Sequence, residues 1–153
     1  MIHHKREIDF RFLAEPTDVN FGGKVHGGIV MKWMDQAGYA CASQWSGCYC
    51  VTVSVGGIRF MKPILVGQKV VLNAKIVHTG KTSMHIFISV KAGDPKEMDM
   101  QETCTCIISF VAIDEDGNSV QVDHWEPETE EDKLMETFAI HAKEFSQRLQ
   151  AEL

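Results

Sequence analysis

The sequence contains no long hydrophobic run and no excess of positive charge. Its most apolar segment, residues 29–45, is too short and too interrupted to cross a bilayer, which takes about 20 apolar residues in succession. The first five residues lack the apolar centre of a signal peptide. Because 21 Asp and Glu outnumber 15 Lys and Arg, the net charge is −6, which argues against non-specific binding to nucleic acid. We therefore expect neither a membrane nor a nucleic-acid partner.

Disulfides are not expected either, although the chain has five cysteines. The number is odd and the cysteines lie in apolar patterns, which is typical of reduced thiols in the cytoplasm. Two Cys-x-Cys pairs, Cys48 with Cys50 and Cys104 with Cys106, resemble half of a zinc site. Each pair lies in a strand or helix pattern, however, without the turn that zinc thiolates usually need. We expect buried thiols, no metal and no cofactor.

The order of the hydrophobic patterns predicts a fold of class α+β, and 153 residues are enough for one core. Alternating or β-branched residues predict five strands, at 7–13, 49–60, 69–78, 82–91 and 103–113. An apolar helix lies between the first two strands, so the expected fold is an antiparallel sheet wrapped around one long buried helix. We assign this domain to residues 1–125, and an acidic linker with a C-terminal helix to residues 126–153.

Glycines and apolar spacing predict finer features of these elements. Gly47 is placed to end the central helix, and the pair Gly56-Gly57 predicts a bulge or a close backbone approach in its strand. In the C-terminal helix, apolar residues recur every three or four positions, which indicates one face that docks on the body of the protein or on a partner subunit. These residues are Leu134, Phe138, Ala142, Phe145 and Leu149.

The central helix carries the most informative residue. Its apolar side chains cover nearly the whole circumference, which is typical of a buried helix, yet it contains Asp35. A carboxylate is costly to bury without a partner. Asp35 is therefore either half of a surface ion pair with Lys32, three residues earlier, or a catalytic carboxylate that faces a substrate cleft.

Two glycines and a histidine precede this helix. The N–H groups of Gly27 and Gly28 at a helix N-terminus have no partner within the helix and carry a positive partial charge. They could stabilise the oxyanion of an acyl-transfer intermediate, or the glycines could simply form a tight turn. His26 could act as a general base or pack against the loop.

The string GKT at residues 80–82 is not a P-loop. A P-loop has another glycine five residues before the first, where this chain has Lys75, and it joins a strand to a helix rather than two strands. Lys81 could touch an anionic ligand, or it could be a solvated turn residue.

Three strings together resemble the hotdog-fold acyl-CoA thioesterases of the bacterial acyl-CoA hydrolase group. They are PTDVNFGGKVHGGIVMKWMDQAG (16–38), VTVSVGGIRFMKPILVG (51–67) and HTGKTSM (78–84). The resemblance implies a hotdog fold and hydrolysis of acyl-CoA to free CoA and a carboxylic acid, with CoA present only as part of the substrate and product. It further implies an active unit of at least a dimer, often a trimer of dimers, in which the catalytic Asp and Asn come from opposite subunits.

The same resemblance implies roles for individual residues. Asp35 is the catalytic carboxylate, and Asn20 is its companion from the preceding loop. Gly27 and Gly28 polarise the thioester carbonyl. Some relatives carry Asn or Asp where this chain has Lys24, which is a departure from the pattern. The remaining substrate contacts are His26, Thr52, Ser54, Gly56, Gly57, Gly80, Lys81, Thr82 and Ser83.

Two other functions remain open at this level. A hotdog dehydratase or hydratase acts on similar thioesters, but it usually shows a His-Phe-Pro type string, which this chain lacks. A non-catalytic sensor of acyl-CoA or nucleotide is the second alternative. The residues also leave open whether Asp35 acts as a general base on water or as a nucleophile.

Overall fold

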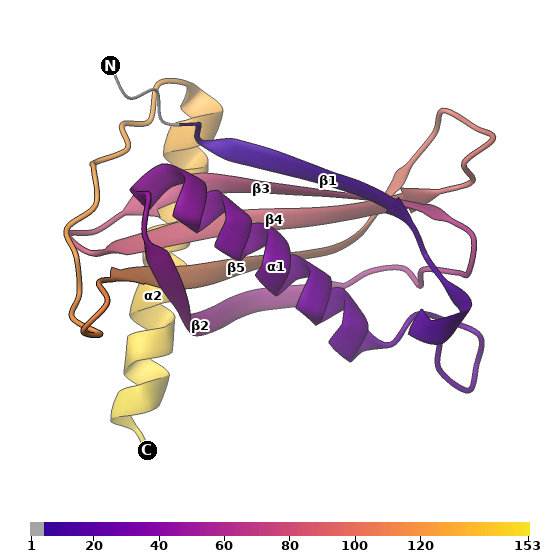
Figure 1. Ribbon diagram of the computed structural model, residues 1–153, viewed down its shortest axis with the longest axis horizontal. Coiled ribbons are helices and arrows are strands. Elements are labelled where there is room, and N and C mark those ends of the chain that lie inside the picture. The colour runs from indigo at the N-terminus through magenta and orange to yellow at the C-terminus, as the bar shows by residue number, and fades with distance from the viewer. Residues whose placement is uncertain (1–4) are drawn as a thin grey trace.

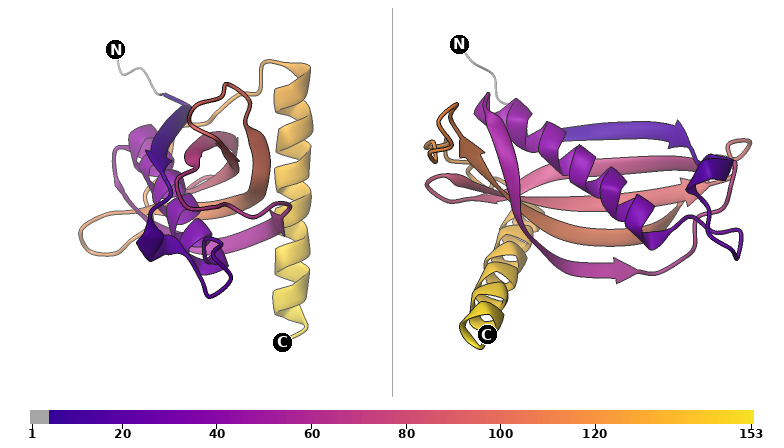
Figure 2. Two further views of the ribbon diagram at one scale, coloured as in Figure 1. Left: turned by 90° about the vertical axis from the view of Figure 1, so that its right-hand side faces the viewer. Right: turned by 60° about the horizontal axis from the view of Figure 1, so that its bottom comes forward.

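The computed structural model describes residues 5–153 as an antiparallel five-stranded sheet with one helix on each face (Figures 1 and 2). The strands lie in the order β1-β3-β4-β5-β2, so β1 and β2 form the edges. None of the helices in residues 5–153 combines the length and the apolar character that crossing a bilayer requires. The elements are β1 (Glu7–Leu13), a 3₁₀ turn (Pro16–Asp18), α1 (Gly27–Ser46), β2 (Tyr49–Phe60), β3 (Lys69–Thr79), β4 (Ser83–Gly93), β5 (Gln101–Ile113) and α2 (Glu130–Ala151).

The sheet curls around α1, whose inner side forms the core of the protein (Figure 2). Close contact between helix and sheet depends on Gly38, because a Cβ there would lie 2.7 Å from Phe110 Cε2. The helix ends as predicted at Gly47, which has a φ of 70° and donates its N–H to Ser43 O over 2.8 Å. The buried residues of α1 are Val30, Met34, Ala37, Gly38, Cys41, Ala42 and Trp45.

The prediction that α1 is buried on all sides is wrong for one face of the single chain. Met31, Lys32, Asp35 and Tyr39 are exposed there. The helix is rich in apolar residues, but the sheet of one chain covers only the opposite side of it. This exposed helix face, which carries both apolar and charged side chains, therefore remains available for another molecule.

β2 is an edge strand with an irregular register. The predicted bulge is confirmed, since the pairing with β5 shifts between Gly56 and Arg59 and Gly57 has a φ of 61°. Val53 and Val55 are 51% and 41% exposed. An edge strand with apolar side chains and unpaired backbone groups is a ready template for pairing with another chain.

α2 begins at Glu130, within the segment predicted as an acidic linker, because Thr129 and Asp132 form a reciprocal capping box. The Asp132 carboxylate also pairs with Arg6 over 2.7 Å. The helix docks through Ala139 and its neighbours on Val77 and Ile107 of the outer sheet face. Of the predicted docking face, Ala142 packs on this cluster. The other four residues are exposed in the single chain, so docking on a partner subunit stays a prediction; they are Leu134 (72%), Phe138 (48%), Phe145 (60%) and Leu149 (49%).

Candidate active site

Asp35 lies on the exposed side of α1, where the edge strand β2 supplies a hydrogen-bond donor. The hydroxyl of Thr52 donates to Asp35 Oδ1 over 2.6 Å. Within residues 5–153, Asp35 makes no ion pair with Lys32. The carboxylate is therefore oriented by a neutral donor rather than neutralised by a cation, and its Oδ2 is left for other contacts.

Asp35 and Thr52 border a pocket of about 330 Å³. Met34 and Cys106 both line this pocket, and the Cys106 thiol lies 3.9 Å from Met34 Sδ. Burial raises the pKa of Cys106 to about 12, so this thiol is not a nucleophile at neutral pH. The pocket can hold an apolar group with the carboxylate at its mouth. Its other lining residues are Met31, Lys32, Met34, Val55, Ile58, Cys106 and Ile108.

Asn20 lies in the loop before α1 and shapes that loop with its own side chain. Its Oδ1 accepts the N–H groups of Gly22 and Lys24 over 2.9 and 3.2 Å. The amide nitrogen of Asn20 makes no hydrogen bond to any other residue in the range 5–153. The side chain is exposed, so this nitrogen can donate to a ligand or a second chain.

Gly27 and Gly28 are the first two residues of α1, after the N-cap residue His26, which makes no side-chain capping bond. Their N–H groups belong to the first turn, which has no acceptors within the helix. His26 itself is exposed, and its backbone oxygen accepts from Ile29. Gly27 borders a second pocket, of about 290 Å³, together with Asn20 and Lys24.

The Asp35 carboxylate does not meet Gly27 and Asn20, the other predicted catalytic groups, within one chain. Gly27 and Asp35 are eight residues apart on α1, which corresponds to about 12 Å along the helix axis at 1.5 Å per residue. Asp35 and Asn20 border different pockets. One thioester carbon cannot contact both the Asp35 carboxylate and the Gly27 amide of the same chain.

The predicted contacts on β2 divide between the two faces of the sheet. Thr52 faces Asp35, whereas Ser54 and Gly56 border a small cavity beneath α2. Gly57 faces the same helix, since a Cβ there would lie 3.8 Å from Phe138 Cζ. The structure thus brings one of these four residues next to the carboxylate.

The turn from Gly80 to Ser83 joins β3 to β4 and is held from several sides. Gly80 N–H donates to Ser83 O over 2.9 Å, and Lys81 O accepts from Val122 N–H over 2.9 Å. Thr82 O accepts from Ala112 N–H over 3.2 Å. The Lys81 side chain is exposed and forms no ion pair with another residue in the range 5–153, so a fixed backbone presents its ammonium group to solvent.

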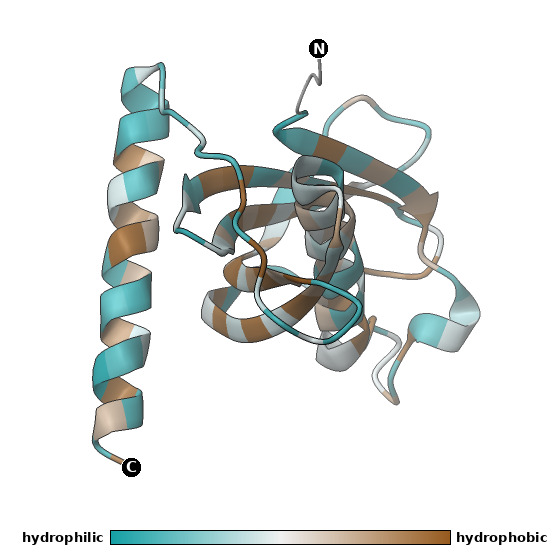
Figure 3. Ribbon diagram, turned by 60° about the vertical axis from the view of Figure 1, so that its left-hand side comes forward, coloured by the Kyte–Doolittle hydropathy of each residue, from teal (hydrophilic) through white to brown (hydrophobic). Residues whose placement is uncertain are grey.

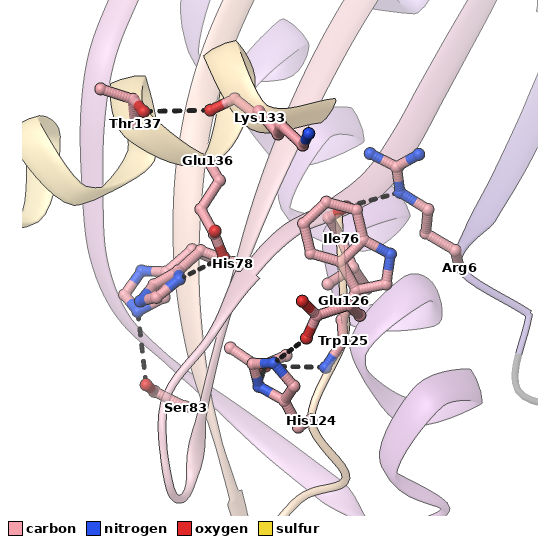
Figure 4. Close-up of polar contacts among 12 residues, drawn as sticks. Arg6, Ile76, His78, Ser83, His124, Trp125, Glu126, Lys133, Glu136 and Thr137 are labelled. Carbon is pink, nitrogen blue, oxygen red and sulfur yellow. Dashed lines mark hydrogen bonds and ion pairs between the residues drawn. The ribbon is translucent and has the colours of Figure 1, made fainter. Parts of the chain in front are cut away.

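A polar network beneath α2 is not predicted by any sequence motif (Figure 4). The His85 ring is buried, with Nδ1 2.6 Å from Ser109 Oγ and its centroid 5.3 Å from that of His78. His78 Nδ1 in turn lies 2.9 Å from Glu136 Oε2 of α2. Burial, with His78 and Lys143 nearby, lowers the pKa of His85 to about 4. The residues come from three strands and a helix, so no short spacing pattern links them.

Comparison with known sequences places this chain among thioesterases. A family model described as the thioesterase superfamily matches residues 22–98. Protein VdlD of Helicobacter pylori is 32% identical, over 90% of this chain and 78% of its own length. The acyl-CoA thioester hydrolase YciA of Salmonella typhimurium is 36% identical, over 72% of this chain and 86% of its own length.

Solved structures agree with these matches. An acyl-CoA hydrolase from Bacillus cereus superposes with a TM-score of 0.90 at 28% identity, covering 95% of this chain and 89% of that one. A hexameric acyl-CoA thioesterase gives a TM-score of 0.89 at 28% identity, with coverage of 95% and 93%. The family model spans half of the sequence and the relatives most of it, so this chain, with its sheet wrapped around α1, belongs to the hotdog-fold thioesterase superfamily.

Proposed function

We propose that this protein hydrolyses acyl-CoA to free CoA and a carboxylic acid, with Asp35 as the catalytic carboxylate. The observation that carries this assignment is the position of Asp35, oriented by Thr52 over 2.6 Å at the mouth of an apolar pocket. An acyl chain is the apolar group that a thioesterase must accommodate. Named relatives such as YciA are acyl-CoA thioester hydrolases.

Two chemical roles fit the free Oδ2 of Asp35. As a general base it takes a proton from water while the water oxygen bonds to the thioester carbon. The carbon–sulfur bond then breaks, and the departing CoA sulfur receives the proton. As a nucleophile, the carboxylate oxygen itself bonds to that carbon and releases CoA, and water then hydrolyses the mixed anhydride. Either route uses only the substrate and water, so we propose that no metal or cofactor takes part.

The complete site, in this proposal, forms between two chains. Gly27 and Gly28 of one copy would polarise the thioester carbonyl, with Asn20 of that copy beside them and Asp35 supplied by the other. The roughly 12 Å between Gly27 and Asp35 within one chain supports this division. The free edge of β2, with its exposed Val53 and Val55, supports pairing of two copies. We propose a dimer and, since a structural neighbour is hexameric, a trimer of dimers.

The spacing of three polar residues supports these roles. For an acyl-CoA hydrolase from Staphylococcus aureus, which shares the fold at 23% identity, structures describe alanine variants of an asparagine, an aspartate and a threonine that lie 15 and 17 residues apart. Asn20, Asp35 and Thr52 have the same separations along this chain.

The proposal also includes a phosphate-binding role for Lys81 and a cytoplasmic location. The exposed ammonium group of Lys81 on its fixed turn is suited to a CoA phosphate, with Gly80, Thr82 and Ser83 shaping that turn. A cytoplasmic location fits the five unpaired cysteines, since thiols stay reduced in that compartment.

Release of free thiol from acyl-CoA tests the function directly. We expect the wild-type protein to turn over a series of acyl chain lengths, and Asp35→Asn to lose most of the rate while keeping its fold by circular dichroism. Equal rates for the two proteins would move the chemistry away from Asp35. Tight binding of acyl-CoA without turnover in the wild type would identify a sensor instead of an enzyme.

A further inference from the structure

We propose that α2 pairs with α2 of a second copy of this chain, antiparallel and side by side. The contact is made by four apolar residues, which we call the α2 stripe. They are Leu134, Phe138, Phe145 and Leu149. This inference rests on the self-association proposed above and adds a second contact to it, distant from the α1 side of the sheet.

Residues 5–153 leave about half or more of each side chain of the α2 stripe uncovered. Its four side chains are between 48% and 72% exposed, and Figure 3 shows hydrophobic bands alternating with hydrophilic ones along this helix. α2 docks on the sheet through a different side, which contains Ala139. Exposed apolar patches of this kind mark interaction surfaces in soluble proteins.

The position of α2 indicates where the covering molecule lies. α2 crosses behind the sheet, and its C-terminal part extends beyond the free edge at β2 (Figures 1 and 2). The Phe138 ring lies beside that edge, because a Cβ on Gly57 of β2 would lie 3.8 Å from it. A molecule that covers the stripe must therefore sit beside β2, where a second copy would lie in a dimer joined at this edge.

The spacing of the stripe identifies its occupant as a second copy of itself. Four residues separate Leu134 from Phe138, seven separate Phe138 from Phe145, and four separate Phe145 from Leu149. This pattern is the same in both directions along the helix. A two-fold antiparallel pair centred between residues 141 and 142 therefore places Leu134 opposite Leu149 of the other copy, and Phe138 opposite Phe145. Such self-complementarity is what a two-fold interface requires, and an unrelated partner would not require it.

Disulfide trapping tests the register of this pair. Leu134 and Leu149 are 15 residues apart, or about 22 Å on one helix, which is far beyond the Cα separation of about 7 Å that a disulfide spans. The double variant Leu134→Cys/Leu149→Cys can thus form this bond only between copies. Under mild oxidation we expect it to run as a covalent dimer without reducing agent, and as a monomer with it.

The single variants and the wild type are the matched controls. Leu134→Cys alone and Leu149→Cys alone should stay monomeric on the same gel. In the proposed register, position 134 faces position 149 of the other copy, so neither single variant places two cysteines opposite each other. The wild type controls for native thiols, of which four are buried and Cys48 is partly buried. A monomeric double variant, or single variants that cross-link as fully as the double, would overturn the proposal.

A charge substitution gives a second, independent measurement. Phe145→Glu places a charge in the stripe, and Gln147→Glu places the same charge on an exposed position outside it. We expect Phe145→Glu to weaken self-association at least tenfold by sedimentation velocity, and Gln147→Glu to match the wild type. Equal association of both variants would contradict the pairing. Thiol release by the wild type is scored separately, so failure of the hydrolase assignment remains distinguishable from failure of this contact.

Discussion

Replacing Thr52 by Val should slow hydrolysis without unfolding the protein. The variant keeps the shape and β-branching of the side chain but removes the hydroxyl that donates to Asp35 Oδ1 over 2.6 Å. A hydrogen bond to a charged group contributes about 1.5–3 kcal/mol. If this bond holds Asp35 in its reactive orientation, its loss should lower kcat by about 10- to 150-fold, since each 1.4 kcal/mol corresponds to about a factor of ten.

Thr52→Ser is the matched control, because serine retains the donor. We expect it to recover most of the wild-type kcat in a free-thiol release assay, while KM for acyl-CoA changes little in either variant. Thr52 lies exposed on an edge strand, so Tm should shift by only a few degrees. Full activity of Thr52→Val, or an equal loss in both variants, would refute the role given to this hydrogen bond.

Two further predictions concern stability. Gly38→Ala puts a Cβ 2.7 Å from Phe110 Cε2, and such overpacking costs about 1–3 kcal/mol. The better helix propensity of alanine offsets about 1 kcal/mol of this, so Tm should fall by up to about 8 °C. Gly28→Ala is the control and should not lower Tm, because nothing lies within 4 Å of the new Cβ. Burial lowers the pKa of His85 from 6.5 to about 4, so the folded protein holds this ring neutral where the unfolded chain would protonate it. The free energy of unfolding therefore decreases as the pH falls from 6.5 toward 4, by about 1.4 kcal/mol per pH unit. Thermal melts at pH 7 and 5 should show this loss in the wild type, and His85→Gln should lack much of it.

The elements of the fold were largely predictable because their signals are local. β1 and β2 have the predicted bounds, Glu7–Leu13 and Tyr49–Phe60, since alternation and β-branching act over a few residues. Gly47 ended α1 where expected for the same reason, as a positive φ is required at that one position. Asp35 could be singled out because a carboxylate within an apolar helix conflicts with its surroundings.

The partners of these residues could not be predicted from spacing. Nothing in the sequence indicates that Thr52 rather than Lys32 meets Asp35, because that contact depends on how β2 lies against α1 across 17 residues of chain. The network of His78, His85 and Glu136 depends in the same way on tertiary packing. An apolar periodicity predicts that a helix face will be covered, but not by what. This explains the error on α1, and it is why the sequence left both the body of the protein and a partner subunit open as the cover for α2.

Three exposed surfaces that carry apolar side chains adjoin one edge of the sheet: the outer face of α1, the strand β2 and the α2 stripe. Soluble monomers rarely leave such large apolar areas in water. A second copy at this edge would cover them, and it would also bring its own Gly27 amide toward Asp35, which the first copy cannot do across about 12 Å. Association and catalysis then depend on the same surface. A substitution that separates the copies should therefore abolish hydrolysis without altering Asp35, and the rate per chain should fall on dilution below the dissociation constant.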